Sequence, residues 1–356
     1  MGPFKKFIGF WFIGSQIIFF SCSERISQEF VTDDPPSIAI NGIIDNSGGP
    51  YYVEVKQTRS GYQVPFPIEN AIVHLVDGEG NREAFEYRED GRYEVAGEIV
   101  QGVSGGVYHI EVQVGEEVYF SDPERMPGLL GTNELSWEEI AVPSTTSNGI
   151  NIEKTLLDFD LLADLPDAEE PAFLQWQLVE TYQIRPTDFP DIAGVIPPPC
   201  FVTRNIGVQN FYLLSQDEYG NPTYEIESVI QREIDISFLV KHIFSIHQSS
   251  ITEAYYDYLA QVSLLTENTG SLFDPPLGRI SGNIHHQGEG PQALGYFAAV
   301  VKDTTHMAVY RGDIDTYIMD ICLFDPAKTR YPPFCLDCLQ LTGTTLDVPY
   351  WWSRVR

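Results

Sequence analysis

Two cysteines near the end of the chain have a spacing that could support chemistry. Cys335 and Cys338 stand three positions apart in the stretch YPPFCLDCLQ. Such a pair can hold a metal ion, act as a redox couple or form structural disulfides. The cellular compartment decides among these roles, so the first question is where the chain resides.

The N-terminus predicts export. Two lysines precede an apolar run over residues 7–20, which is shorter than the roughly 20 residues that a membrane-spanning helix needs. This arrangement is typical of a signal peptide. Small Ser21 precedes Cys22, as in a bacterial lipobox, where the cysteine is acylated and becomes the new N-terminus. We therefore predict a signal peptide over residues 1–21 and lipidation of Cys22, and the alternative is a plain signal peptide cleaved near Cys22.

The charge of the chain limits its partners. Its 51 acidic and 21 basic residues give a formal net charge of −30. A surface this anionic argues against binding nucleic acid or anionic lipid headgroups. The chain is also 43% hydrophobic and 13% aromatic, enough for a folded core. We expect the acyl chains, rather than the protein surface, to hold it at a membrane.

Export favours the disulfide interpretation of the cysteines. Besides Cys22 there are four, an even number: Cys200, Cys322, Cys335 and Cys338. A zinc site would need a second close pair, and a redox pair would open a helix after a strand, whereas two prolines directly precede this one. We expect Cys335 and Cys338 each to bond to Cys200 or Cys322, and the spacing leaves the pairing open.

The histidines and common catalytic motifs give no active site. His285 and His286 follow a glycine-rich stretch with Glu289 nearby, but adjacent histidines rarely chelate one ion, so we expect a solvated loop and no metal. His242 and His247 are five apart in an apolar strand-like run, which places them on opposite faces. The stretch GVSGG at 102–106 has the G-x-S-x-G pattern, but it stands between two predicted strands, where we expect a hairpin turn and not a nucleophile elbow, and no phosphate-binding loop occurs. We predict no cofactor and no catalytic residues.

The residues after the anchor predict a mainly β protein. Residues 22–36 are polar and are expected to form a tether. Residues 37–125 contain short runs with period-two alternation, separated by turn sequences such as DNSGGP and DGEGN. These runs are 37–44, 51–57, 71–77, 83–89, 91–97, 106–114 and 117–122. Seven strands at this spacing predict an immunoglobulin-like β-sandwich.

A larger β-rich domain is expected over residues 135–356, after a Pro/Gly-rich linker at 121–134. Its predicted strands are 153–164, 172–184, 204–216, 224–236 and 296–304. In the second of these, Gln175 and Gln177 alternate with Leu174, Trp176, Leu178 and Glu180. A helix is expected near 251–267, with Ser250 and Glu253 as a capping box and Gly270 as a stop signal.

Several stretches in a fixed order resemble a known family. They are the lipobox, GRYE, GGVYHIEV, LQWQLVETYQI, SSITEAYYDYLAQV and the closing CLDCLQLTGTTLDVPYWW. Together they resemble the Bacteroidetes lipoproteins called domain of unknown function 4249. The resemblance implies an accessory role beside a TonB-dependent outer-membrane receptor, and it supplies no catalytic residues.

These observations predict an outer-membrane lipoprotein, on the periplasmic or cell-surface side with the surface favoured. We expect it to be a non-catalytic binding or accessory module that assists nutrient uptake. Tyr350, Trp351 and Trp352 are a possible contact patch. Alternatively, these aromatic residues pack the end of the chain onto the core beside the disulfides. The other functional hypotheses are a cell-surface hydrolase of glycans or peptides and an adhesin.

Overall fold

The computed structural model describes most of the chain after residue 36. The described residues are 37–59, 64–128, 131–165, 171–189, 197–206, 211–216, 223–267, 280–290 and 292–355. The predicted signal peptide over 1–21, the lipidated Cys22 and the tether over 22–36 lie outside these ranges, as does Gly270. Within them, no helix is long and apolar enough to cross a membrane.

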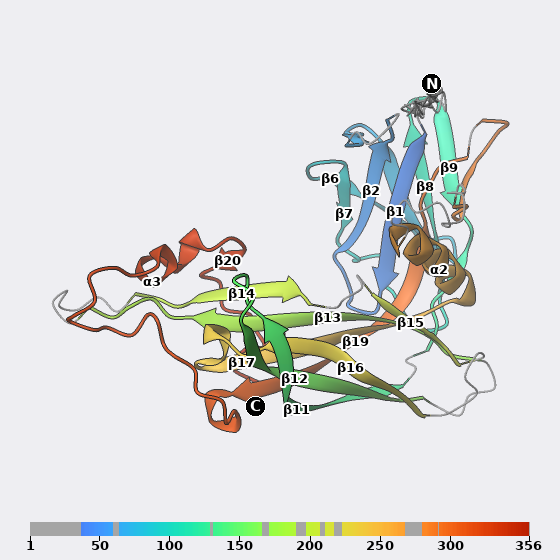
Figure 1. Cartoon of the computed structure of the whole chain (residues 1–356). Coiled ribbons are helices and arrows are strands. Elements are labelled where there is room, and N and C mark those ends of the chain that lie inside the picture. The colour runs from blue at the N-terminus through green and yellow to red at the C-terminus, as the bar shows by residue number, and fades with distance from the viewer. Residues whose placement is uncertain are drawn as a thin grey trace, which may run out of the picture.

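The first part of the chain forms two antiparallel layers, which stand upright in Figure 1. One layer contains β1 (Ile38–Asp45), β2 (Tyr51–Gln57), β3 (Phe66–Pro67), β6 (Glu86–Tyr87) and β7 (Arg92–Val95). The other contains β4 (Ile72–Asp77), β5 (Arg82–Ala84), β8 (Val107–Val114), β9 (Glu117–Ser121) and β10 (Glu124–Arg125). The predicted strands of this region are thus confirmed, with 83–89 divided between β5 and β6.

One apolar core joins these two layers. Alternate residues of each strand point inward, as the period of two requires. The core includes Ile40, Ile44, Val53, Val55, Val73, Leu75, Tyr93, Ile110 and Val112. Two facing sheets with a shared core agree with the expected sandwich, and the immunoglobulin-like connectivity stays a prediction.

Residues from much later in the chain complete this sandwich. Strand β18 (Ile284–His286) pairs with β9, and β19 (Phe297–Tyr310) pairs in parallel with β1 through the register Gly42↔Phe297. The first half of β19 supplies Phe297, Ala299 and Val301 to the sandwich core. Its second half pairs with β17 (Lys241–Ile251), so one sheet continues across the two expected domains.

The second part of the chain is a broad sheet covered on one face by a smaller one. The broad sheet extends from β19 through β17 to β13 (Phe173–Ile184), and then to β14 (Cys200–Asn205), β15 (Tyr212–Ser215) and β20 (Thr344–Thr345). The covering sheet contains β11 (Thr132–Thr145), β12 (Asn151–Asp164) and β16 (Thr223–Glu233). Their shared core includes Leu157, Phe159, Trp176, Leu178, Phe238, Phe244 and Ile246.

The predicted strands of this second part differ from the structure in several places, and the short strands β18 and β20 were not predicted. The single strand expected over 204–216 is two strands, because β14 and β15 pair with different halves of β13. Strand β11 was not predicted, and it begins inside the expected linker. It pairs only with β12 among the described strands, and such an edge strand tolerates a proline such as Pro143.

The predicted helix is confirmed as α2 (Glu253–Glu267), which packs beside the base of the sandwich in Figure 1. Its Tyr255 and Leu259 contact Phe173, Tyr296 and neighbouring apolar residues. The predicted capping box is wrong, because Ser250 is fully buried within β17. Instead the Thr252 hydroxyl accepts a hydrogen bond from the Tyr255 N–H at 3.2 Å.

The C-terminal segment is held by two disulfides. It contains η2 (Arg311–Asp313), α3 (Pro333–Leu336) and η3 (Cys338–Gln340), while η1 (Ile236–Phe238) lies earlier, before β17. Cys338 is bonded to Cys200 and Cys335 to Cys322, with sequence separations of 138 and 13 residues. The expectation that the two close cysteines bond elsewhere, and not to each other, is confirmed.

Candidate ligand-binding site

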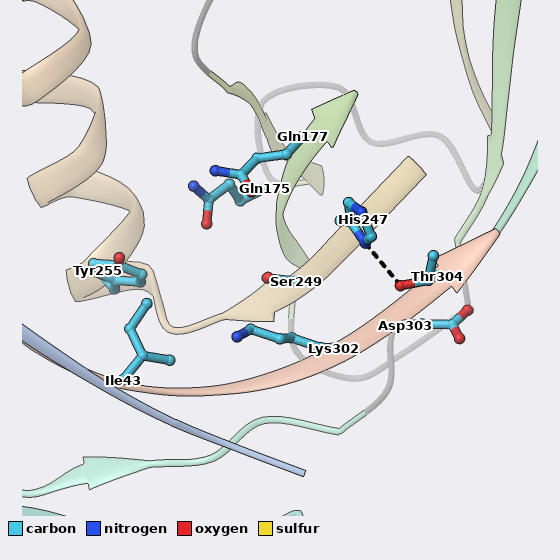
Figure 2. Close-up of a pocket in the computed structure, with 9 residues that line it drawn as sticks. All are labelled: Ile43, Gln175, Gln177, His247, Ser249, Tyr255, Lys302, Asp303 and Thr304. Atoms are coloured by element: carbon cyan, nitrogen blue, oxygen red, sulfur yellow. Dashed lines mark hydrogen bonds between the residues drawn. The ribbon is translucent and has the colours of Figure 1, made fainter. Parts of the chain in front are cut away.

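The face of the broad sheet opposite the smaller sheet carries a strip of polar side chains. We call this the polar strip: Gln175, Gln177, His247, Ser249, Lys302 and Thr304. The strand registers place these residues in two rows across β13, β17 and β19. Gln175, Ser249 and Lys302 form one row, and Gln177, His247 and Thr304 form the next. Figure 2 shows the side chains of both rows.

A cavity lies over this strip where the sandwich meets the broad sheet. Its volume is about 330 Å³, and Asp303 also lines it. Ile43 of β1 and Tyr255 of α2 form the wall on the sandwich side (Figure 2). The cavity exists because β19 passes from one sheet partner to another, which brings β1 and α2 against the polar face.

The groups that line the cavity carry little charge apart from the Asp303 carboxylate. Burial, together with the charges of His306 and Lys302, lowers the pKa of His247, so its imidazole is neutral near pH 7. The Lys302 ammonium pairs with Asp45 at 2.7 Å. Burial also raises the pKa of Tyr255 to about 12, so its phenol remains protonated.

Several of these groups are free to bind a ligand. His247 Nδ1 and Thr304 Oγ1 are hydrogen-bonded to each other at 2.9 Å. The side chains of Gln175, Gln177 and Ser249 have no hydrogen-bond partner among the described residues. Each can both donate and accept. The site therefore offers neutral hydrogen-bonding groups on a rigid sheet.

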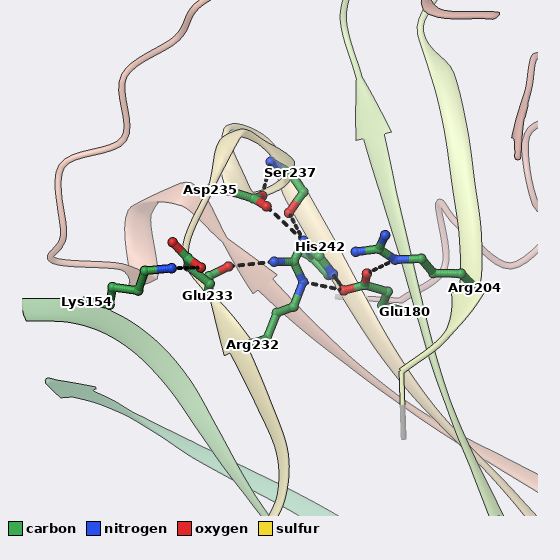
Figure 3. A network of polar contacts seen from close by, with 8 residues as sticks. All are labelled: Lys154, Glu180, Arg204, Arg232, Glu233, Asp235, Ser237 and His242. Carbon is green, nitrogen blue, oxygen red and sulfur yellow. Dashed lines mark hydrogen bonds and ion pairs between the residues drawn. The ribbon is translucent and has the colours of Figure 1, made fainter. Parts of the chain in front are cut away.

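A second polar cluster lies on the covered side of the same sheet and has a different character. Glu180 is fully buried and accepts from Arg232 and His242, each at 2.9 Å, and from Arg204 (Figure 3). Burial opposes its ionisation, but the hydrogen bond from His242 and the charge of Arg232 prevail and lower its pKa to about 2. Arg232 also pairs with Asp235.

This cluster is structural. His242 is fully buried, and its ring stacks with the rings of both Phe238 and Phe244. Burial lowers its pKa, so the imidazole is neutral and donates from Nε2, while Nδ1 has no partner within the described chain. The contacts of Glu180 join β13, β14, β16 and β17. They stabilise the sheet that carries the polar strip.

The two adjacent histidines lie on a different sheet from the polar strip and have their own partners. The expected solvated loop at His285 and His286 is wrong, because both residues lie on β18 and pair with β9. His285 contacts Asp122 at 2.9 Å, and His286 contacts Glu117. Among the described residues, no group of three His, Cys, Asp or Glu side chains is placed to hold a metal ion.

The three C-terminal aromatic residues differ in exposure. Tyr350 is 81% exposed, whereas Trp351 and Trp352 are half-buried. Trp351 stacks on His306 with ring centroids 4.6 Å apart, and Trp352 packs edge-on against Phe201. Both tryptophans thus pack the chain end onto the broad sheet, near the disulfide that β14 carries.

Fold and site together define a multi-sheet β protein with a polar cavity at the junction of its two parts. A family model described as domain of unknown function (DUF4249) matches residues 24–306. The chain therefore belongs to this family. No curated protein matches the chain.

Sequence reasoning missed most of the site. The alternation of LQWQL did place Gln175 and Gln177 together on one face of a strand, opposite large apolar residues. It also placed Glu180 on the apolar face, which is a signal for a buried, paired charge. His247, Ser249 and Thr304 belong to other strands, and nothing local indicated that these strands are neighbours of β13.

Proposed function

We propose that this protein is a non-catalytic binding or accessory module that a lipid on Cys22 anchors to the outer membrane. In this role it assists a TonB-dependent receptor in nutrient uptake. The observation that carries the proposal is the cavity over the polar strip, where hydroxyl, amide and neutral imidazole groups face a space of about 330 Å³. Groups of this kind orient a bound molecule through hydrogen bonds.

The position of the cavity relative to the chain start supports this role. Strand β1 begins at the far end of the sandwich and ends beside α2 (Figure 1), and its Ile43 lines the cavity. An eight-residue strand spans roughly 26 Å. A tether that enters at the start of β1 would hold the cavity away from the anchored end, where a ligand or receptor can reach it.

The chemistry of the cavity supports binding more than turnover. His247 already bonds Thr304, and Lys302 is neutralised by Asp45. Apart from the Asp303 carboxylate, the free groups are the amides of Gln175 and Gln177 and the hydroxyl of Ser249, which hold a ligand but are weak acids and bases. The net charge of −30 disfavours polyanionic ligands.

Co-purification from native outer membranes tests the proposal. The tagged full-length protein is extracted in mild detergent, with the Cys22→Ala form as the control. We expect a stoichiometric TonB-dependent receptor with the wild type and its loss with Cys22→Ala. Recovery of the lipoprotein alone, at high yield from intact membranes, would contradict the accessory role.

A further inference from the structure

The sheet face that carries the polar strip extends beyond the cavity to the C-terminal segment, where Trp351 lies. The next row across the same face is Val179, Ser245 and His306. Ser245 Oγ and His306 Nδ1 are hydrogen-bonded at 2.7 Å, and Trp351 stacks on the His306 ring. With about 3.4 Å per residue, Ser249 and Ser245 lie roughly 14 Å apart along β17. The face is therefore elongated, with Tyr255 at one end and Trp351 at the other.

A ligand on this face meets side chains and not free backbone. Strand β17 is paired on both sides, by β13 and β19. β13 has β14 and β15 on its other side, and β19 has β1. The backbone N–H and C=O groups of the central strands are already hydrogen-bonded to neighbouring strands. A peptide therefore cannot add here as a further strand.

The side chains match a ligand rich in hydroxyl groups. Amides, serine and threonine hydroxyls and neutral imidazoles each donate and accept, as a hydroxyl group does. The cation of the polar strip, Lys302, is already paired with Asp45, so an anionic chain gains little here. The ring of Trp351 offers an apolar surface at the far end, where it covers His306.

We propose that this face binds a neutral oligosaccharide, which lies across β13, β17 and β19 from the Tyr255 wall to Trp351. This inference rests on the proposed function, because it names the ligand class of the same site. It goes beyond the cavity, because the ligand is an extended chain that reaches the C-terminal segment. Gln175 and Gln177 hold it near α2, and Trp351 contacts its distal units.

Affinity electrophoresis of the full-length protein in mild detergent tests this inference. The gels contain neutral polysaccharides (laminarin, glucomannan, dextran or xylan), and dextran sulfate serves as the anionic comparison. We expect retardation by at least one neutral polymer and none by dextran sulfate. Gln177→Ala should weaken binding of that polymer at least tenfold. The matched control is Gln231→Ala, which removes an exposed glutamine on β16 and should change nothing.

A second variant tests the length of the site. Trp351→Ala should weaken binding of a hexasaccharide of the bound polymer and leave binding of its disaccharide unchanged, by calorimetry. Equal losses for both lengths would overturn the extended arrangement. Unchanged thermal midpoints of all three variants show that the fold is retained.

The remaining outcomes separate the two proposals. Receptor co-purification without retardation by any neutral polymer overturns the oligosaccharide and leaves the accessory function standing. Retardation that depends on Gln177, without a receptor, supports the oligosaccharide and contradicts the accessory function. Binding of tryptic casein peptides that is lost in Gln177→Ala, in place of the polymers, overturns the ligand class in favour of peptides.

Discussion

At the scale of single residues, the carboxylate of Glu180 compensates the charges of Arg204 and Arg232 and accepts from His242. We expect Glu180→Gln to lower the free energy of unfolding by about 3–5 kcal/mol, because it leaves Arg232 largely buried without this partner. Urea denaturation at neutral pH measures this loss.

A surface pair between β12 and β16 provides the control. Lys154 and Glu233 are paired at 2.8 Å, with side chains 37% and 50% exposed. We expect Glu233→Gln to cost less than about 1 kcal/mol, because water screens this pair. Similar losses in the two variants would show that the burial of Glu180 does not matter.

The same carboxylate sets an acid dependence of stability. The pKa of Glu180 is about 2 in the folded protein, below its ordinary value of 4.5. A lowered pKa stabilises the fold above the ordinary value, and the contribution is lost as the pH falls towards the folded value. We expect the stability difference between the wild type and Glu180→Gln to narrow from about pH 6 to about pH 2.5. A difference that stays constant over this range would contradict the assignment.

At the scale of elements, α2 is attached to the sandwich through Thr252, the residue that precedes its first turn. The Thr252 hydroxyl caps the helix and donates to the buried Glu124 at 2.9 Å. We expect Thr252→Ala to cost about 1–2 kcal/mol, because both a cap and a donor to Glu124 are lost. Glu253→Ala, at an exposed position in the first turn, should cost less than about 0.5 kcal/mol. Urea denaturation measures both losses. A loss for Glu253→Ala as large as that for Thr252→Ala would mean that Glu253 contributes to the cap, as the sequence had predicted.

At the scale of the whole molecule, the two disulfides close loops of very different length. The chain-entropy model gives about 5 kcal/mol for the Cys200–Cys338 separation of 138 residues and about 3 kcal/mol for the Cys322–Cys335 separation of 13. We expect the double serine variant of the first pair to unfold at lower urea than that of the second. The opposite order would mean that the short C-terminal loop has the greater effect on stability.

The sandwich depends on strands from late in the chain, because β18 pairs with β9 and β19 pairs with β1. A fragment of residues 37–128 lacks β18 and β19, and so loses Ile284, Phe297, Ala299 and Val301 from the sandwich core. It also leaves β1 without its parallel partner. We expect this fragment to show no cooperative thermal transition by circular dichroism, because the open core is exposed to water. A sharp transition would show that the sandwich folds independently.

The sequence by itself determined the features that depend on local periodicity. Alternation identified most sandwich strands, and the stripe from Tyr255 to Leu259 identified α2, because side-chain direction follows the backbone period. The same alternation put Gln175 and Gln177 on one face. An even cysteine number in a chain predicted to be exported indicated disulfides.

The tertiary structure alone decided which of these elements meet. The parallel contact of β1 with β19 joins residues about 255 positions apart in the chain, as between Gly42 and Phe297. The cavity, the partners of Glu180 and the cysteine pairing all depend on contacts of this kind. A local pattern records which face of a strand is polar, but not which strands are its neighbours. Which strands become neighbours is decided by the burial of the whole apolar core, and the pairing of β13, β17 and β19 then creates the cavity.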